Sequence, residues 1–119
     1  MLQIDYSSRA PIYEQLVDKI KTLIVKNVLK VNEQMLTVRE LASQLTINPN
    51  TVQRAYRILE EEGYIYSVTG KGSFVSDKIV NIREDQVKTE LVKLNQVIER
   101  LKNLGVYVEY KPKKGDDTQ

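Results

Sequence analysis

The chain has 119 residues, 41% of them hydrophobic and 29% charged, so it is long enough for one compact domain or one small domain with an appendage, and too apolar for wholesale disorder. Its 18 basic and 16 acidic side chains leave a net charge of +2, which does not by itself indicate a nucleic-acid partner. Cysteine and histidine are both absent, which removes most metal sites and most catalytic nucleophiles and bases, so we expect no enzyme, no metal and no cofactor.

The sequence also bears on location. No apolar run approaches the roughly 20 residues needed to cross a bilayer. The first five residues lack both the basic part and the apolar part of a secretion signal. We therefore expect a cytoplasmic protein with no membrane partner.

The first predicted helix begins at Pro11, a residue favoured at the first helical position, and runs to about Val28 after an extended lead-in from residue 2 to residue 8. Its apolar face repeats at helical spacing and consists of Leu16, Ile20, Leu23 and Ile24. In the next stretch, Asn27 and Asn32 tolerate the left-handed conformation found at helix ends and in turns. Residues 27–34 are therefore expected to form a connecting loop.

Two short helices are predicted next. Thr37-Val38-Arg39-Glu40 has the form of a capping box, so a second helix begins there and ends near Thr46. Asn48-Pro49 places a favoured cap before a proline at the first helical position and so opens a third helix. Two short helices with so tight a connection form a helix-turn-helix. The apolar face of the second helix is Val38, Leu41, Ala42 and Leu45.

The third helix carries two stripes at helical spacing, one predicted to pack and the other to be exposed. It is expected to end at Gly63, because glycine takes the left-handed position after a helix without steric cost. The apolar stripe is Val52, Ala55, Tyr56 and Leu59. The polar stripe is Asn50, Gln53, Arg54 and Arg57.

A β-hairpin with a cationic tip is predicted after the third helix. Residues 64–68 are β-branched or aromatic, residues 73–76 form a second strand-like run, and Thr69-Gly70-Lys71-Gly72 lies between them. Beside a helix-turn-helix, such a hairpin is the wing.

From about Ile82 to Leu104 the pattern is helical again, with apolar residues that alternate at four and three positions, as in the seam of a heptad repeat. Gly105 is predicted to end this helix, and residues 106–110 alternate like a short strand before a polar tail from Lys111. The predicted seam is Val87, Leu91, Leu94, Ile98 and Leu101.

Several of these segments together resemble the GntR family of bacterial regulators, in particular its short YtrA-like branch. Ordered motifs at family-like spacing are a stronger signal than a single helix-turn-helix pattern. The chain departs from the family at two places. It has Asn27 and Asn32 where the family usually has glycine, and asparagine can take the glycine conformations. It also has Met35-Leu36-Thr37 where the family usually has Leu-Pro-Ser, and threonine can cap a helix as serine does. The matching segments are 11–16, 37–42, 48–52, 55–59 and 70–75.

The resemblance implies that the third helix lies in the major groove of DNA, where amides pair with adenine and guanidinium groups with guanine. The candidates for reading bases are Asn50, Gln53 and Arg54. The alternative is a solvated helix face, and the family motifs on both sides favour base contacts for Asn50 and Gln53 more than for Arg54.

Three further residues are candidates for contacts to DNA. Arg39 lies in the first turn of the second helix, where the helix dipole disfavours a cation unless an anion is bound, and the resemblance implies a phosphate or base contact. Thr51 and the backbone N–H groups at the start of the third helix are expected to hold a phosphate, the alternative being a plain preference for threonine at a helix start. Arg57 either reaches the DNA backbone or pairs with Glu60 or Glu61.

At the wing tip, Gly70 and Lys71 resemble the family's minor-groove element, because glycine permits close approach and lysine meets a high negative potential there. The alternative is an ordinary hairpin turn. The aromatic residues Tyr13, Tyr56 and Phe74 fall on apolar faces and are expected in the core, not on a stacking platform.

The expected fold is mainly α with a small β-hairpin. A winged helix-turn-helix DNA-binding domain is assigned to residues 1–78, and a helical dimerisation segment with a polar tail to residues 79–119. About 40 residues after the wing leave no room for a large effector domain, and the resemblance implies the branch whose short helical tail dimerises. The alternative is that the seam folds back onto the first helix of the same chain.

The expected function is that of a sequence-specific transcription regulator, a homodimeric repressor on a palindromic operator in double-stranded DNA. The resemblance adds a neighbouring transporter operon as a target. An unknown small-molecule effector, bound between the winged domain and the tail helix, is a further expected partner. The alternative function is a winged-helix module that binds protein or RNA.

Overall fold

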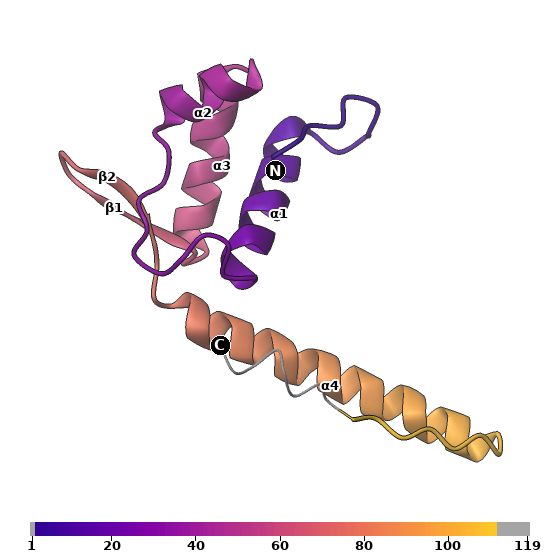
Figure 1. The fold of residues 1–119 in the computed structure, drawn as a ribbon. Helices are drawn as coiled ribbons and strands as arrows, with labels where there is room; N and C mark the ends of the chain where they lie inside the picture. The colour runs from indigo at the N-terminus through magenta and orange to yellow at the C-terminus, as the bar shows by residue number, and fades with distance from the viewer. Residues whose placement is uncertain (1, 112–119) are drawn as a thin grey trace. The chain divides into compact units, whose positions relative to one another are not determined.

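The computed structural model describes residues 2–111, so the tail beyond Lys111 lies outside the described residues. Within them the elements follow one another as α1 (Ile12–Val25), α2 (Val38–Leu45), α3 (Pro49–Glu61), β1 (Ile65–Val68), β2 (Gly72–Val75) and α4 (Ile79–Asn103) (Figure 1). The prediction of a mainly α fold with a small hairpin is confirmed. The chain divides into two compact units between Arg83 and Glu84. No helix in this part of the chain is long and apolar enough to cross a membrane.

Helix α1 is shorter than predicted at both ends. Pro11 is its N-cap, with an extended ψ of 152°, so the helix begins one residue later. It ends at Val25 because Asn27 adopts a left-handed φ of 62°, and the N–H of Val28 turns back to the carbonyl of Leu23 at 2.9 Å. The lead-in has no regular secondary structure up to Asp5, and there a turn begins, in which the Ser8 N–H donates to the Asp5 carbonyl.

The helix-turn-helix forms as predicted. Both hydrogen bonds of the capping box are present: the Glu40 N–H donates to the Thr37 hydroxyl at 3.1 Å, and the Thr37 N–H donates to the Glu40 carboxylate at 2.8 Å. Thr46 ends α2 in the left-handed region, and the Asn48 side chain caps α3 before Pro49.

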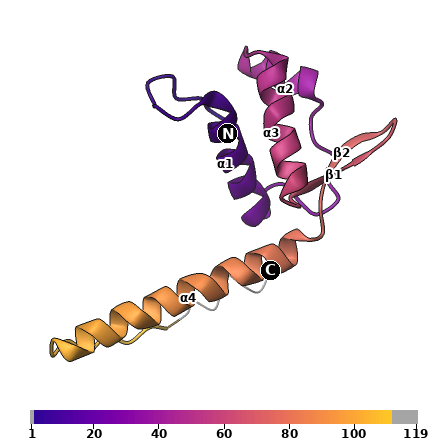
Figure 2. The ribbon, with the colours of Figure 1, turned by 180° about the vertical axis from the view of Figure 1, so that it is seen from behind.

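Helix α3 is the centre of the core. It lies beside α1 in both views and packs against α2 as well (Figures 1 and 2). The predicted apolar stripe faces these helices, and Val52, Ala55 and Leu59 are fully buried. Burial of this stripe fixes the rotation of α3 about its axis, so the polar stripe must face outward.

The hairpin follows α3 as predicted, after Gly63 takes a φ of 86°. Strands β1 and β2 are antiparallel, with Ile65 opposite Val75 and Val68 opposite Gly72. The loop of residues 32–35 runs along the free edge of β2 and exchanges backbone hydrogen bonds with it, for example from the Met35 N–H to the Ser73 carbonyl at 2.8 Å. The sequence did not predict that this loop pairs with the hairpin.

Of the three aromatic residues expected in the core, only Tyr56 is buried. Its hydroxyl donates to the Leu36 carbonyl at 2.6 Å, and burial, with the charge of Glu40 as a lesser cause, raises the pKa of Tyr56 to about 12. Phe74 is half-buried and stacks on Tyr66 with ring centroids 5.6 Å apart, and Tyr13 is also half-buried. The prediction was wrong for these two because a hairpin and a helix edge cover only one side of a ring.

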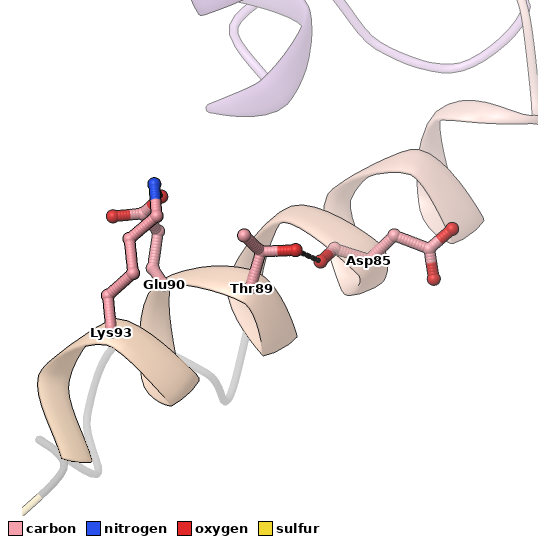
Figure 3. A network of polar contacts seen from close by, with 4 residues as sticks. All are labelled: Asp85, Thr89, Glu90 and Lys93. Carbon is pink, nitrogen blue, oxygen red and sulfur yellow. Dashed lines mark hydrogen bonds and ion pairs between the residues drawn. The ribbon is translucent and has the colours of Figure 1, made fainter. Parts of the chain in front are cut away.

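Helix α4 begins at Ile79, three residues before the predicted start at Ile82. The earlier start has a packing cause, because Ile79 is buried and Ile82 is half-buried against the winged domain's core. Further along, Thr89 donates to the Asp85 carbonyl at 3.0 Å, and Lys93 and Glu90 form an ion pair at 3.1 Å (Figure 3). These polar contacts use positions outside the predicted seam.

The strand predicted for residues 106–110 is wrong. Gly105 takes a φ of 86°, the Val106 N–H bonds to the Leu101 carbonyl, and the chain turns back beside α4 without forming a strand (Figure 1). Residues 106–109 line a hollow with Ile98 and Lys102 of the helix. A helix satisfies its own backbone groups, so it offers a neighbouring segment no ladder of hydrogen bonds.

Candidate nucleic-acid interface

The polar stripe of α3 is exposed along its whole length. Asn50 and Gln53 lie in the first half of the helix, and among residues 2–111 neither side-chain amide makes a hydrogen bond within the chain. Each amide carries both donors and an acceptor, which is the set that pairs with the major-groove edge of adenine. The fold therefore presents two free amides on the outer face of its central helix.

A groove of about 380 Å³ separates this stripe from the wing. Gln53 and Arg57 line it from α3, and Gly70 lines it from the hairpin. Glu60 also lines the groove, but its carboxylate accepts a hydrogen bond from the Ser67 hydroxyl at 3.0 Å. In the described part of the chain Arg57 forms no ion pair within 4.0 Å, so the guanidinium is available to an external anion.

Arg39 occupies a second hollow, at the turn between α2 and α3. The hollow measures about 890 Å³ and is shared with Ser43, Thr46 and Asn48. The Arg39 guanidinium is exposed and, within residues 2–111, has no carboxylate partner, although it stands at the positive end of α2. A phosphate at this hollow would relieve the unfavourable placement.

The start of α3 differs from the expected phosphate cradle. The Asn50 N–H donates to the Asn48 side chain at 2.8 Å, and the Thr51 N–H donates to the Asn48 carbonyl at 3.0 Å. These donors are satisfied within the chain because asparagine caps the helix. The half-buried Thr51 therefore has its hydroxyl, and not its N–H, to offer to a phosphate.

Arg54 is placed differently from the other members of the stripe. Its guanidinium carbon lies 3.8 Å from the centroid of the Tyr13 ring, in cation–π contact with α1. Such a contact ties α3 to α1 and holds the charge away from the wing groove, which Arg54 does not line. A base contact by Arg54 would have to break it.

Replacing Arg54 by alanine is expected to lower the free energy of unfolding by about 0.5–1 kcal/mol, because the cation–π contact is lost. In a Tyr13→Leu background the same replacement should have no further effect, which denaturant unfolding of both single variants and the double variant measures. Arg57→Ala is the matched control, since no aromatic ring in the described part of the chain lies against Arg57. An equal loss from Arg54→Ala in both backgrounds would contradict the contact.

The wing tip is a glycine-bounded turn. Gly70 and Gly72 have φ values of 78° and 117°, and the Lys71 N–H donates to the Val68 carbonyl at 2.9 Å. Nothing lies within 4 Å of a Cβ added to Gly70, so a partner can approach closely there. Lys71 is exposed between the two glycines. Gln34, which no sequence pattern singled out, holds the Lys71 carbonyl through its side chain.

The seam of α4 is exposed at its first two positions and partly covered at the other three. Val87 is 41% exposed and Leu91 is 37% exposed, while Leu94, Ile98 and Leu101 are half-buried. Apolar side chains at heptad spacing that are left this accessible form a surface suited to a partner helix. Within residues 2–111 no cluster of three or more acidic side chains is placed to hold a metal ion.

Comparison with known proteins gives concordant results. The profile of bacterial regulatory proteins of the gntR family matches residues 12–75. The transcriptional repressor YtrA of Bacillus subtilis is 39% identical over 112 residues, which are 92% of this chain and 80% of that protein. A transcriptional regulator from Oenococcus oeni superposes with a TM-score of 0.68 at 38% identity, over 89% of this chain and 88% of that chain. The DNA-binding domain of AraR in complex with operator ORX1 has a TM-score of 0.58 at 26% identity, over 63% and 96% of the two chains.

Proposed function

Since the chain belongs to the gntR family of bacterial regulatory proteins, and is a DNA-binding transcription regulator and not an enzyme, we propose that it acts as a homodimeric repressor on a palindromic operator. The observation that carries the proposal is the exposed polar stripe of α3, in which the amides of Asn50 and Gln53 have no partner within residues 2–111, beside a cationic wing. A major groove admits one helix, and we assign the hairpin next to it to the neighbouring minor groove. The name of the relative YtrA as a repressor supports the sign of regulation.

We assign the DNA contacts by chemistry. Asn50 and Gln53 are the base readers, because their amides are exposed and unbonded. Arg57 and the Thr51 hydroxyl contact the backbone beside α3, and Arg39 takes a phosphate at the hollow before α3. Gly70 and Lys71 enter the minor groove. Arg54 contributes to DNA binding only if it leaves the Tyr13 ring.

Dimerisation is assigned to the seam of α4. Two copies that join through the same surface are related by a twofold axis, so two recognition helices face two half-sites in opposite directions. The operator is then an inverted repeat whose half-sites lie about one helical turn apart. The exposure of Val87 and Leu91 in the single chain supports this assignment.

We infer the regulatory setting from the resemblance to the YtrA-like branch. The protein acts in the cytoplasm, where its operator lies, and a neighbouring transporter operon is its target by resemblance to YtrA-like regulators. A small-molecule effector would release the operator by changing the spacing of the two recognition helices. A ligand screen that leaves operator affinity unchanged would count against such an effector.

Fluorescence anisotropy tests the proposal directly. The protein is titrated onto labelled duplex DNA from upstream of its own gene and onto a scrambled duplex, at two salt concentrations. We expect a preference for the upstream duplex on the order of 1,000-fold, and weaker binding at higher salt because phosphate contacts release counterions. Equal weak binding to both duplexes would favour the alternative function, a winged-helix module that binds protein or RNA. No binding at either salt would refute the DNA-binding proposal.

A further inference from the structure

The loop before α2 is bound to the wing. The Asn32 N–H donates to the Val75 carbonyl at 2.8 Å, the Val75 N–H donates to the Glu33 carbonyl at 2.9 Å, and the Met35 N–H donates to the Ser73 carbonyl at 2.8 Å. Through these three bonds, residues 32–35 lie beside β2 as a third, strand-like segment of the sheet. They hold the base and the middle of β2 and leave the turn beyond it without a backbone partner from this loop.

The side chain of Gln34 extends the contact to the turn itself. Its amide nitrogen donates to the Lys71 carbonyl at 2.8 Å, across 37 residues of sequence. The same nitrogen would lie 3.1 Å from a Cβ added to Gly72, a tight contact, so the amide rests close against the wing at this glycine. Within residues 2–111, no other side chain forms a hydrogen bond to the segment from Thr69 to Gly72.

We propose that Gln34 is a positioning residue for DNA binding. By holding the Lys71 carbonyl, it orders the wing tip and fixes the direction in which the Lys71 side chain extends toward the minor groove. The inference rests on the proposed wing contact of Lys71. A hairpin with four-residue strands is marginal by itself, and glycines on both sides of Lys71 give the tip more conformational freedom than other residues would. Ordering the tip before DNA arrives lowers the entropy lost on binding.

A matched control lies at the base of the same hairpin. The Tyr66 hydroxyl donates to the Asn32 side chain at 2.9 Å, so Tyr66→Phe also removes one side-chain hydrogen bond between this loop and the wing. It does so away from the turn and keeps the aromatic ring that stacks on Phe74. A general loosening of the sheet would follow from either replacement, whereas loss of tip positioning follows only from replacement of Gln34.

The test compares Gln34→Met, Lys71→Ala, the double variant and Tyr66→Phe in anisotropy titrations of the upstream duplex over a salt series. Methionine keeps the length of the side chain and removes the donor. Lys71→Ala is expected to flatten the salt dependence by about one phosphate contact. Gln34→Met should weaken binding about threefold, the loss expected for one hydrogen bond, and should flatten the salt dependence in the same direction. In the Lys71→Ala background it should change neither quantity, and Tyr66→Phe should leave the salt dependence unchanged.

Three results would overturn the inference. If Gln34→Met weakens binding equally with and without Lys71, Gln34 acts on DNA directly. If Lys71→Ala flattens the salt dependence and Gln34→Met does not, the amide does not position the lysine, while the wing contact stands. If Lys71→Ala itself changes nothing, the proposed wing contact and this inference both fail. Gln34→Ala repeats the comparison with a different change in packing, and thermal melting shows that each variant is folded.

Discussion

Replacing Leu91 and Leu94 together by lysine is expected to turn the protein into a monomer and to lower its affinity for the operator by about 100-fold or more. Both residues lie in the seam of α4, so a dimer would have to bury four ammonium groups, two from each chain, against apolar partners. A monomer engages one half-site at a time and loses the gain in effective concentration that a linked pair provides. Light scattering after size-exclusion chromatography measures the mass, and anisotropy measures the affinity.

Val92→Lys is the control for the seam. Val92 is 57% exposed and follows Leu91 directly, so it lies outside the alternation of four and three that defines the seam. The same charge placed there should leave a dimer with normal operator affinity. A dimer that survives the Leu91 and Leu94 replacements, or one that is lost equally with Val92→Lys, would show that the seam does not join the chains.

Replacing Gln53 by alanine is expected to weaken operator binding by about 5- to 150-fold, corresponding to about 1–3 kcal/mol, and to relax the preference at one base pair in each half-site. The amide is exposed on α3, lines the groove that faces the wing and has no hydrogen bond within residues 2–111. Because the amide is uncharged, the salt dependence of binding should not change. Titrations of operators with each base pair substituted in turn measure the preference.

Arg57→Ala supplies the contrast, since Arg57 lies one turn further along the same groove and carries a charge. It should weaken binding to all duplexes by a similar factor and flatten the salt dependence by about one contact. If Gln53→Ala instead weakens the operator and the scrambled duplex equally, Gln53 contacts the backbone and does not read a base. That outcome would leave Asn50 as the remaining amide reader.

The helix-turn-helix could be predicted from the sequence because its signals are local. The capping box spans Thr37 to Glu40, the Asn48 cap lies next to Pro49, and the apolar stripe of α3 repeats within one helix. Once that stripe is buried, the helical period alone directs Asn50 and Gln53 outward. The left-handed Asn27 and Asn32 likewise follow from residue type.

Contacts between distant segments needed the tertiary structure. Arg54 belongs to the same polar stripe as Gln53, yet a ring from α1 holds its guanidinium. The short strand expected after Gly105 turned back along α4, because alternation in a sequence does not provide a hydrogen-bonding neighbour. Helix α4 began early because its first turn packs against the winged domain's core.

The sequence by itself thus determined the order of the helices, the place of the tight turn between α2 and α3 and which stripe of α3 is exposed, since each depends on residues within one or two turns of each other. Only the tertiary structure decided which exposed side chains are free and which are held. The Gln34 amide meets the Lys71 carbonyl across 37 residues, and no local spacing encodes that distance. Such a contact forms only when folding brings the hairpin and the loop before α2 together, so it is a property of the folded chain and not of neighbouring residues.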